Sequence, residues 1–349
     1  MTLFELPYIL GYSVKKRYAL KNRKRLPNNV ISIGNITLGG TGKTPAVMAL
    51  AKTAAARGFY PCILTRGYRG KAEGPCLVSK GDGPLLDAHQ AGDEAVLMAE
   101  RLPGVPIVKA KDRYEAGMFA RAHLELQPPD IGARLLFILD DGFQHWILCR
   151  DKDILLIDGT NPFGNRKLFP LGPLREPLSA IRRADIIVIT NASFGEDGTE
   201  SVEIPGEGIR NLTKEIRQYV ASAQVYLAQH SPTAFKTVSG NMLDLSAMRD
   251  KKVFAFCGIG NPHSFQGTLL PLVGELTGRI FFRDHYQYSR ADFQRIADNA
   301  VKSGADWIVT TEKDIMRLKG FLLPENLLAL CIEFHVDDRF YTDAFDLRR

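Results

Sequence analysis

A glycine-rich segment early in the chain has the residue types and spacing of a phosphate-binding loop. Its last six residues are Gly39, Gly40, Thr41, Gly42, Lys43 and Thr44. In such a loop the backbone N–H groups bind phosphates, Lys43 reaches the β- and γ-phosphates, and Thr44 holds Mg²⁺. The usual pattern has glycine where this chain has Thr37, and the glycines that follow can form the same turn. The alternative interpretation is a glycine-rich turn with an incidental Lys-Thr pair.

Two carboxylates follow this loop by about a hundred residues. Asp140 and Asp141 end the apolar run 135–139 and precede Gly142. At the carboxyl edge of a parallel sheet, next to a phosphate loop, carboxylates bind Mg²⁺ directly or through its water. Asp-Asp-Gly also suits an ordinary turn, but its position at the end of a hydrophobic strand favours a metal site.

Transfer of a phosphoryl group to an alcohol needs a side chain that accepts or orients the hydroxyl proton. Asp93, Glu94, His145 and His285 are the candidates in this chain. Spacing alone does not choose between them, because each residue type is also common at surfaces and in satisfied core positions.

The elements that must position these residues follow an alternating pattern. Short apolar runs, typical of strands buried on both faces, occupy 30–33, 62–64, 107–108, 135–139, 154–157 and 186–189. Helical patterns lie between several of them, such as 45–57, which begins with proline and ends at Gly58. This rhythm predicts an α/β fold with a doubly wound, mostly parallel sheet of the P-loop NTPase type.

The strand–helix rhythm weakens over 192–245 and resumes over 253–332. We therefore predict a domain boundary near 222–240. The P-loop domain would occupy 29–222, and a second, smaller α/β domain, which would close over the active site, would occupy 223–349.

The positive charge of the chain is concentrated at its N-terminus. The net charge is +6, and residues 1–28 hold seven basic residues and one acidic residue, so basic and acidic residues are equal in number beyond them. A nucleic-acid-binding protein would be expected to spread Lys and Arg over a folded face, and no such distribution is seen. Apolar residues such as Phe4, Ile9 and Leu10 precede the basic ones. The pattern predicts an amphipathic helix over 1–28 that lies on an anionic membrane surface. A basic helix packed on the protein body is the alternative.

Neither a spanning segment nor a secretion signal is indicated. The apolar stretch is far shorter than the roughly 20 residues that cross a bilayer, and its charges are on the wrong side for a signal peptide. Five cysteines are scattered without metal-binding spacing, which fits a reducing compartment and indicates no site: Cys62, Cys76, Cys149, Cys257 and Cys331.

Several strings of the chain together resemble the tetraacyldisaccharide 4′-kinase family. They appear in family order between about residues 30 and 315. The strings are Gly34-Asn35 with the phosphate loop to Pro45, Thr65-Arg66-Gly67-Tyr68, Gly92-Asp93-Glu94, Asp112-Arg113, Asp140-Asp141-Gly142-Phe143-Gln144-His145, Gly172-Pro173-Leu174-Arg175-Glu176-Pro177 and Thr310-Thr311-Glu312-Lys313-Asp314. Two of these strings are six residues long, which makes coincidence untenable.

The resemblance implies a lipid A kinase. Its cosubstrates would be ATP and Mg²⁺, and its acceptor the 4′-hydroxyl of a tetraacyl glucosamine disaccharide 1-phosphate, giving lipid IVA. It also implies an N-terminal helix docked at the cytoplasmic face of the bacterial inner membrane. No obligate protein partner is evident. In the family an Asp of the Gly-Asp-Glu string pairs with a His of the second domain, and these match Asp93 and His285 here.

The resemblance also extends the site. Asp93, oriented by His285, would accept the hydroxyl proton, while Lys43 and Arg113 would neutralise charge on the transferred group. Asp140, Asp141, Glu176 and Thr44 would hold the metal or its water. The further residues expected near the reacting groups, without a ranking of roles, are Glu94, Arg66, Tyr68, Gln144, His145 and Arg175. Residues 310–314 would border the nucleotide or form a turn.

Three other functions are less consistent with the sequence. A GTPase switch needs an Asn-Lys-x-Asp string that reads the base, and the chain has none. A soluble nucleotide-dependent synthetase on the same fold would leave the basic N-terminus unexplained. A membrane adaptor without catalytic activity would give the phosphate loop and the paired carboxylates no purpose.

Overall fold

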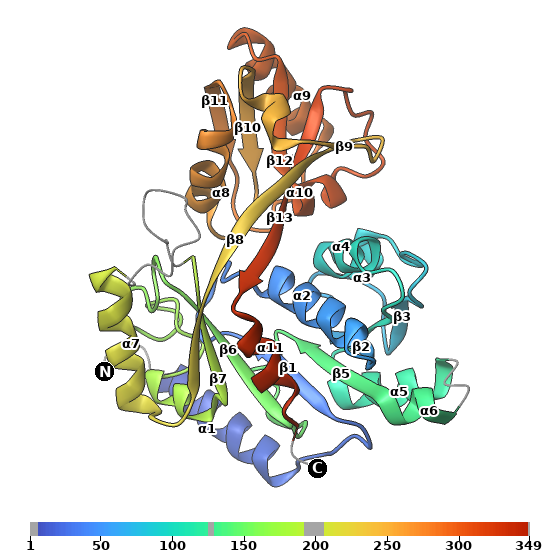
Figure 1. Cartoon of the computed structure of the whole chain (residues 1–349), viewed down its shortest axis with the longest axis vertical. Helices are drawn as coiled ribbons and strands as arrows, with labels where there is room; N and C mark the ends of the chain where they lie inside the picture. Colours follow the sequence, from blue (N-terminus) through green and yellow to red (C-terminus); the bar gives the residue numbers. More distant parts are fainter. Residues whose placement is uncertain (1–5, 125–128, 192–205, 348–349) are drawn as a thin grey trace. The chain divides into compact units, whose positions relative to one another are not determined.

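The computed structural model describes residues 6–124, 129–191 and 206–347, and the chain forms two compact units (Figure 1). The first unit contains Met1–His230 and Phe334–Arg349, and the second contains Ser231–Glu333. The sequence assigned everything from 223 to 349 to a second domain. In the structure, Phe334–Arg349 belong to the first unit instead.

The first unit is built on a sheet with strand order β3-β4-β2-β5-β1-β6-β7-β8, in which only the edge strand β3 runs antiparallel to its neighbour. The strands are β1 (Val30–Gly34), β2 (Tyr60–Thr65), β3 (Cys76–Ser79), β4 (Ile107–Lys109), β5 (Leu135–Asp140), β6 (Lys152–Asp158), β7 (Ile186–Thr190) and β8 (Gln224–Thr237). This doubly wound, mostly parallel sheet confirms the predicted fold class.

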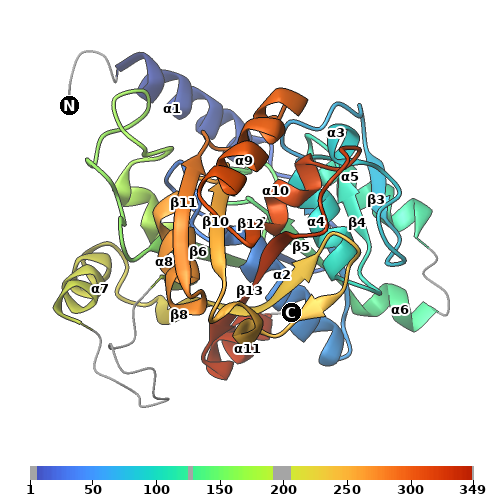
Figure 2. The same cartoon turned by 90° about the horizontal axis from the view of Figure 1, so that it is seen from above.

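Helices cover both faces of this sheet. The strands are apolar on both sides, so both sides must be shielded from water. Every residue of β1, β5 and β7 is buried, which explains their continuous apolar runs. The helices are α1 (Leu6–Lys21), α2 (Lys43–Ala56), α3 (Ala88–Ala91), α4 (Asp93–Arg101), α5 (Arg113–His123), α6 (Pro129–Arg134), the 3₁₀ helix η2 (Leu178–Arg183), α7 (Glu207–Tyr219) and α11 (Asp338–Phe345). In Figures 1 and 2, α3 and α4 lie together beside the β3–β4 edge.

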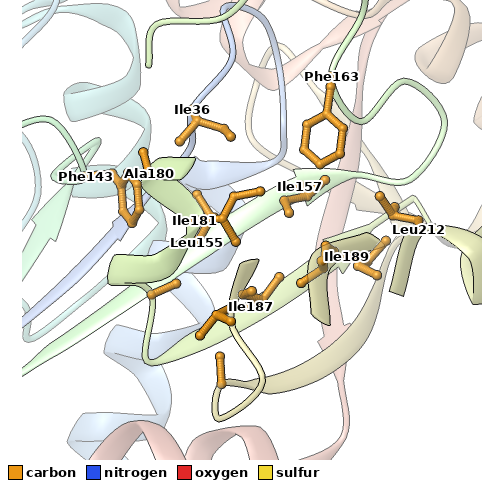
Figure 3. Close-up of a cluster of buried hydrophobic side chains, with 14 of the residues drawn as sticks. Ile36, Phe143, Leu155, Ile157, Phe163, Ala180, Ile181, Ile187, Ile189 and Leu212 are labelled. Carbon is orange, nitrogen blue, oxygen red and sulfur yellow. The ribbon is translucent and has the colours of Figure 1, made fainter. Parts of the chain in front are cut away.

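One buried cluster fixes two of the loops that carry the predicted site. Ile36 lies just before the phosphate-binding glycines, and Phe143 lies just after the acid pair. Both belong to the same cluster of buried apolar side chains, which also includes strand residues such as Ile157 and Ile187 (Figure 3). The two loops are therefore anchored on one core.

The second unit is a smaller sheet with helices on both faces. Its strand order is β11-β10-β12-β13, all parallel, and β9 pairs antiparallel with β8. Its elements are β9 (Met242–Leu243), η3 (Leu245–Met248), β10 (Lys252–Cys257), α8 (Pro262–Leu269), η4 (Leu270–Leu272), β11 (Glu275–Phe281), α9 (Arg290–Lys302), β12 (Trp307–Thr311), α10 (Glu312–Arg317) and β13 (Leu327–Val336). Alternate residues of β10 pack with α8 or with α9, so the two helices cover opposite faces.

The N-terminal helix differs from the predicted one-sided amphipathic helix. Tyr8 and Ile9 pack on the buried cluster of the first unit, whereas Leu10, Val14 and Tyr18 are 64%, 68% and 65% exposed. Apolar side chains therefore face both the body and the solvent. Phe4, which the sequence placed in this helix, lies outside the described residues. Within the part of the chain that the structure describes, no helix has both the length and the apolar character needed to cross a membrane.

Candidate active site

The phosphate loop, residues 37–44, joins the end of β1 to the start of α2. Gly42 is the residue that precedes α2, and its φ of 77° is in the left-handed region that favours glycine. No side chain caps the first N–H groups of α2. A helix N-terminus with free N–H groups attracts phosphate, so the local geometry matches the chemistry expected from the sequence.

The first half of the loop is held by the string that contains Arg175. Thr37 forms an antiparallel bridge with Leu174, the N–H of Leu38 donates to Pro173 O, and the N–H of Arg175 donates to Ile36 O, both at 2.7 Å. The bridge requires extended backbone at Thr37, which explains why glycine is not needed there. The six-residue string Gly172–Pro177 thus shapes the phosphate loop through its backbone.

Asp141 lies between two cations of this region. Nη1 of Arg175 donates to both carboxylate oxygens at 2.8 and 3.0 Å, and Nζ of Lys43 lies 3.7 Å from Oδ1. Burial alone would raise the pKa of Asp141, but Lys43 and Arg175 lower this pKa to about 2. Asp141 is therefore ionised, and it fixes the loop lysine in position.

Asp140 is a buried carboxylate in the opposite electrostatic situation. Its Oδ2 accepts from Thr65 Oγ1 at 2.9 Å, and its Oδ1 has no hydrogen-bond partner among the described residues. Burial, followed by the charges of Glu94 and Asp141, raises the pKa of Asp140 to about 6. A cation bound at Oδ1 would relieve both the desolvation and the repulsion.

These residues fit a magnesium ion whose remaining ligands would be water and the phosphate oxygens of a nucleotide. Among residues 6–124, 129–191 and 206–347, no three His, Cys, Asp or Glu side chains converge as a complete metal site. Mg²⁺ does not require one, because it is usually held by one or two carboxylates, a Thr hydroxyl, water and phosphate oxygens. Asp140 offers an unused buried oxygen, and Thr44 is buried at the start of α2. Asp140 and Thr44 are the residues that would hold the ion.

The loops that carry Asp93 and Tyr68 pack directly against each other. Gly92 precedes α4 with a φ of 95°, and a Cβ atom there would lie 2.7 Å from Tyr68 O. Nζ of Lys109 donates to Ala72 O and Gln90 O at 2.8 and 2.7 Å, which joins the two loops. Asp93 is thereby held, buried, in the first turn of α4.

Arg113 and His145 lie beside the acid pair, but His145 is poorly suited as a base. Nη2 of Arg113 lies 3.4 Å from Asp140 O. The backbone N–H of Arg113 donates to Nε2 of His145 at 3.3 Å, so this nitrogen already accepts a hydrogen bond. Burial and the charge of Arg113 lower the pKa of His145 to about 4. His145 therefore acts as a neutral support for the start of α5.

Glu176 is not available as a metal ligand, contrary to the sequence prediction. Arg183 donates to both of its carboxylate oxygens at 2.7 and 2.8 Å, Gln144 Nε2 donates at 2.9 Å, and Tyr12 OH donates at 3.0 Å. Each oxygen thus accepts two hydrogen bonds, and the side chain is fully buried. A buried carboxylate is paired with the nearest available cation, which here is a guanidinium.

Two further predicted residues lie at the surface. Arg66 is exposed, and Tyr68 is 53% exposed. Gln144 is part of the network that surrounds Glu176, where its Nε2 also donates to Asn35 O at 2.8 Å. Gln144 thus helps to hold the segment that leads into the phosphate loop.

A sequence model of the family described as Tetraacyldisaccharide-1-P 4'-kinase matches residues 1–347. The chain belongs to this family. It is an ATP-dependent kinase, and the predictions of family, fold and enzyme class are confirmed.

Individual members of this family are similar to this chain over most of their length. A Tetraacyldisaccharide 4'-kinase of Halothermothrix orenii is 40% identical over 300 residues, which cover 82% of this chain and 73% of the relative. One of Syntrophus aciditrophicus is 38% identical over 328 residues, which cover 91% of this chain and 83% of the relative. The crystal structure of the "apo" form of LpxK from Aquifex aeolicus in complex with ATP matches with a TM-score of 0.69 and 29% identity, and covers 98% of this chain and 97% of that chain.

In the second unit of the kinase, His285 is supported by the string 310–314. Nη2 of Arg317 lies 3.4 Å from Nδ1 of His285, and Arg317 is paired with the buried Asp314 at 2.9 Å. A guanidinium only donates, so Nδ1 accepts and the hydrogen of a neutral ring lies on Nε2. Asp314 itself is held by Tyr288 OH at 2.8 Å and by Gly258 N at 3.1 Å. The string thus orients His285 through Arg317.

Sequence reasoning missed several residues that hold this kinase site together. Lys109 joins two loops, Arg183 neutralises Glu176, and Thr190 Oγ1 donates to Thr41 O of the phosphate loop at 3.2 Å. Lys109 and Thr190 both end buried strands, as Asp140 does. That position, a polar residue at the carboxyl end of an apolar run, was the available signal.

Proposed function

We propose that this kinase transfers the γ-phosphoryl group of ATP to the 4′-hydroxyl of a tetraacyl glucosamine disaccharide 1-phosphate, which gives lipid IVA. The observation that carries the proposal is the uncapped N-terminus of α2 beside a buried carboxylate with one unused oxygen. Family membership supplies the acceptor, since the family is described as a tetraacyldisaccharide-1-P kinase.

Each residue then has a role in binding or charge neutralisation. The N–H groups at the start of α2 would bind the phosphates, and Lys43, held by Asp141, would stabilise the charge that develops on the transferred group. Mg²⁺, held by Asp140 and Thr44, would neutralise phosphate charge. Arg175 keeps Asp141 ionised and in place, so it acts through Asp141.

The proton of the acceptor hydroxyl would pass to Asp93. A carboxylate base needs a donor that keeps it ionised and correctly oriented. A neutral His285 with its hydrogen on Nε2 has the tautomer that can donate to a carboxylate, and the contact of Nδ1 with Arg317 favours that tautomer. This chemistry supports the pairing of Asp93 with His285 that the family resemblance implies.

Attachment to the cytoplasmic face of the inner membrane would occur through α1. Leu10, Val14 and Tyr18 are four residues apart and form one exposed apolar stripe on the helix. Arg17 and Lys21 are exposed on the same helix and would meet anionic headgroups. This surface suits a peripheral contact with an anionic lipid bilayer, and nothing in the charge distribution suits nucleic acid.

The decisive experiment measures ATP consumption with and without the lipid acceptor, in wild type and in Lys43→Ala. We expect acceptor-dependent ATP consumption, and a fall in kcat by about 10²-fold or more in the folded variant. Consumption that does not depend on the acceptor would reject the proposed substrate. An unchanged kcat in Lys43→Ala would reject the phosphate loop as the catalytic site.

A further inference from the structure

His230 lies directly against the phosphate loop, although no sequence string marks it. It is the last residue of the first unit, on β8. A Cβ atom added to Gly42 would lie 2.1 Å from Cε1 and 2.2 Å from Nε2 of His230. The Cε1–Nε2 edge of the imidazole therefore faces the Cα atom of the residue that precedes α2.

A chain of hydrogen bonds fixes the orientation of this ring. Nδ1 of His230 lies 3.1 Å from Oδ1 of Asn191, and Nδ2 of Asn191 donates to Oδ1 of Asp158 at 3.1 Å. Thr160 also donates to that Asp158 oxygen, through its N–H at 3.0 Å and its hydroxyl at 2.7 Å.

The chemistry of these groups sets the tautomer of His230. A carboxylate only accepts, so the amide nitrogen of Asn191 must face Asp158 and its oxygen must face the ring. Nδ1 of His230 therefore carries a hydrogen, and in the neutral ring Nε2 is the acceptor. Packing alone would not require such control. A defined tautomer matters when the second nitrogen meets a ligand.

The strand order indicates which part of ATP lies on this side of the loop. Asp140 ends β5 on one side of β1, whereas β6, β7 and β8 lie on the other side. Asp158 ends β6, Asn191 follows β7 and His230 belongs to β8. The γ-phosphate must lie toward the carboxylates on β5, so the nucleoside end of the triphosphate extends toward β6–β8. In an α/β sheet of this kind, ligands bind outside the carboxyl ends of the strands.

A second observation also points to a ligand here. Thr41, in the loop between these strands and Lys43, has a buried hydroxyl with no hydrogen-bond partner among the described residues. Phosphate oxygens only accept, so they do not match an accepting Nε2. The nearest donors of a nucleotide beyond its phosphates are the ribose hydroxyls.

We propose that His230, oriented by Asn191 and Asp158, binds a ribose hydroxyl of ATP through Nε2. The inference deepens the proposed function and rests on it only for the use of ATP. His230 is thus a binding residue for the nucleoside. The Asp158–Asn191–His230 chain is a subsite formed at the carboxyl ends of β6 and β7 and at the middle of β8.

The test is a set of binding titrations at pH 8 without lipid acceptor, so an error in the assigned acceptor would not affect them. The ligands are ATP, 2′-deoxy-ATP, 3′-deoxy-ATP and inorganic tripolyphosphate. His230→Phe keeps a ring against Gly42 but removes the acceptor nitrogen. We expect its Kd for ATP to rise about threefold to tenfold, the net effect of one hydrogen bond, and its Kd for tripolyphosphate to stay unchanged.

The deoxynucleotides locate the contact. Wild type should bind one of them about threefold to tenfold more weakly than ATP, and His230→Phe should lose that discrimination. Asn191→Gly keeps the left-handed backbone at this position, φ 53°, but removes the amide. It should lose part of the discrimination, and the double variant should be no worse than His230→Phe. Thermal unfolding of the nucleotide-free variants checks that they fold.

Two results would overturn the proposal. Equal weakening of ATP and tripolyphosphate in folded His230→Phe would show that the ring only shapes the phosphate loop. Discrimination against the deoxynucleotides that is the same in wild type and His230→Phe would show that another residue binds the ribose.

Discussion

The pKa values of two adjacent carboxylates, Asp140 and Asp141, are shifted in opposite directions by their surroundings. Asp141 is paired with Arg175 and lies near Lys43, so its pKa falls to about 2. Burial and the charges of Glu94 and Asp141 raise the pKa of Asp140 to about 6. Neighbouring groups whose pKa values are pushed apart serve different tasks. Asp141 holds the catalytic lysine, and Asp140 is ready to bind a cation.

Asp140→Asn should stabilise the metal-free protein while it abolishes catalysis. The carboxyl has a pKa near 3.8 when unfolded and about 6 when folded, so the folded state binds more protons between these values. Stability therefore falls as pH rises through this window, and the ionised Asp140 is unfavourable above pH 6. We expect the variant to gain on the order of 2 kcal/mol at pH 7.5 and little at pH 4, measured by thermal or urea unfolding without Mg²⁺.

Asp141→Asn is the matched control, and its stability should change in the opposite direction. Its depressed pKa contributes stability that is present above about pH 4 and lost as pH falls toward 2, so the variant should be less stable at pH 7.5. If Asp140→Asn were also destabilised at pH 7.5, the unused buried oxygen would not be the unfavourable group that the structure indicates.

At the scale of elements, the segment Gly172–Pro177 connects three parts of the site. Its backbone bridges to the phosphate loop, Arg175 binds Asp141, and Glu176 accepts from Tyr12 on α1. Such a segment has no regular secondary structure, yet its position is fixed by long-range contacts. Its role in holding the loop explains why a six-residue string can matter without touching a substrate.

Glu176→Gln separates a structural role from a metal-binding one. Removing the carboxylate leaves Arg183 partly buried without its anion, so we expect a loss of about 3 kcal/mol in the free energy of unfolding. The Kd for Mg²⁺·ATP should change less than threefold. Asp140→Asn should show the reverse: higher stability and much weaker Mg²⁺·ATP binding. A Glu176→Gln variant of normal stability that binds Mg²⁺·ATP poorly would restore the original metal-ligand prediction.

Local patterns predicted the elements of this fold better than the contacts between them. The runs 30–33 and 135–139 became β1 and β5, because strands buried on both faces must be continuously apolar. Glu176 was misassigned because its partner Arg183 is recognised only once η2 turns back on the segment. His230 was missed because nothing in its neighbourhood along the chain shows that the middle of β8 lies beside Gly42.

The chain crosses from the first unit to the second through β8 and returns through β13. The sequence offered no sign of the return, because the packing partners of a strand are not visible in its own residues. The C-terminal helix α11 packs with α2 in the first unit, where Tyr226 OH also donates to Asp343. Membership of a unit is thus decided by packing partners rather than by order along the chain.

Asp93 and His285 belong to different units, and their cooperation is a kinetic prediction. If the two side chains activate one hydroxyl, the double alanine variant should have a kcat hardly lower than that of the more damaged single variant. His263 lies in the second unit beside Phe281 and provides a control. Asp93→Ala combined with His263→Ala should show only the effect of Asp93. Losses that multiply in the Asp93/His285 pair would reject the dyad but leave the kinase assignment intact.

The exposed apolar stripe of α1 is the surface proposed to bind the lipid bilayer. Deleting residues 1–28 is a poor test, because it would remove Tyr8 and Tyr12, whose hydroxyls donate to Arg175 O and Glu176. That deletion should lower kcat as well as raise the KM for the acceptor. The exposed stripe can be changed alone, with the triple variant Leu10→Ser, Val14→Ser, Tyr18→Ser.

The triple variant should bind anionic phospholipid vesicles at least tenfold more weakly, because three apolar side chains no longer enter the interface. Its KM for the lipid acceptor should rise while its kcat and its KM for ATP stay near wild type. The control replaces three exposed apolar residues of the second unit, Met242, Val301 and Leu322, with serine. Added salt should weaken the contribution of the basic residues to vesicle binding by the wild type. The contribution of the apolar side chains should remain. Equal vesicle binding by the two triple variants would show that a surface other than α1 meets the membrane.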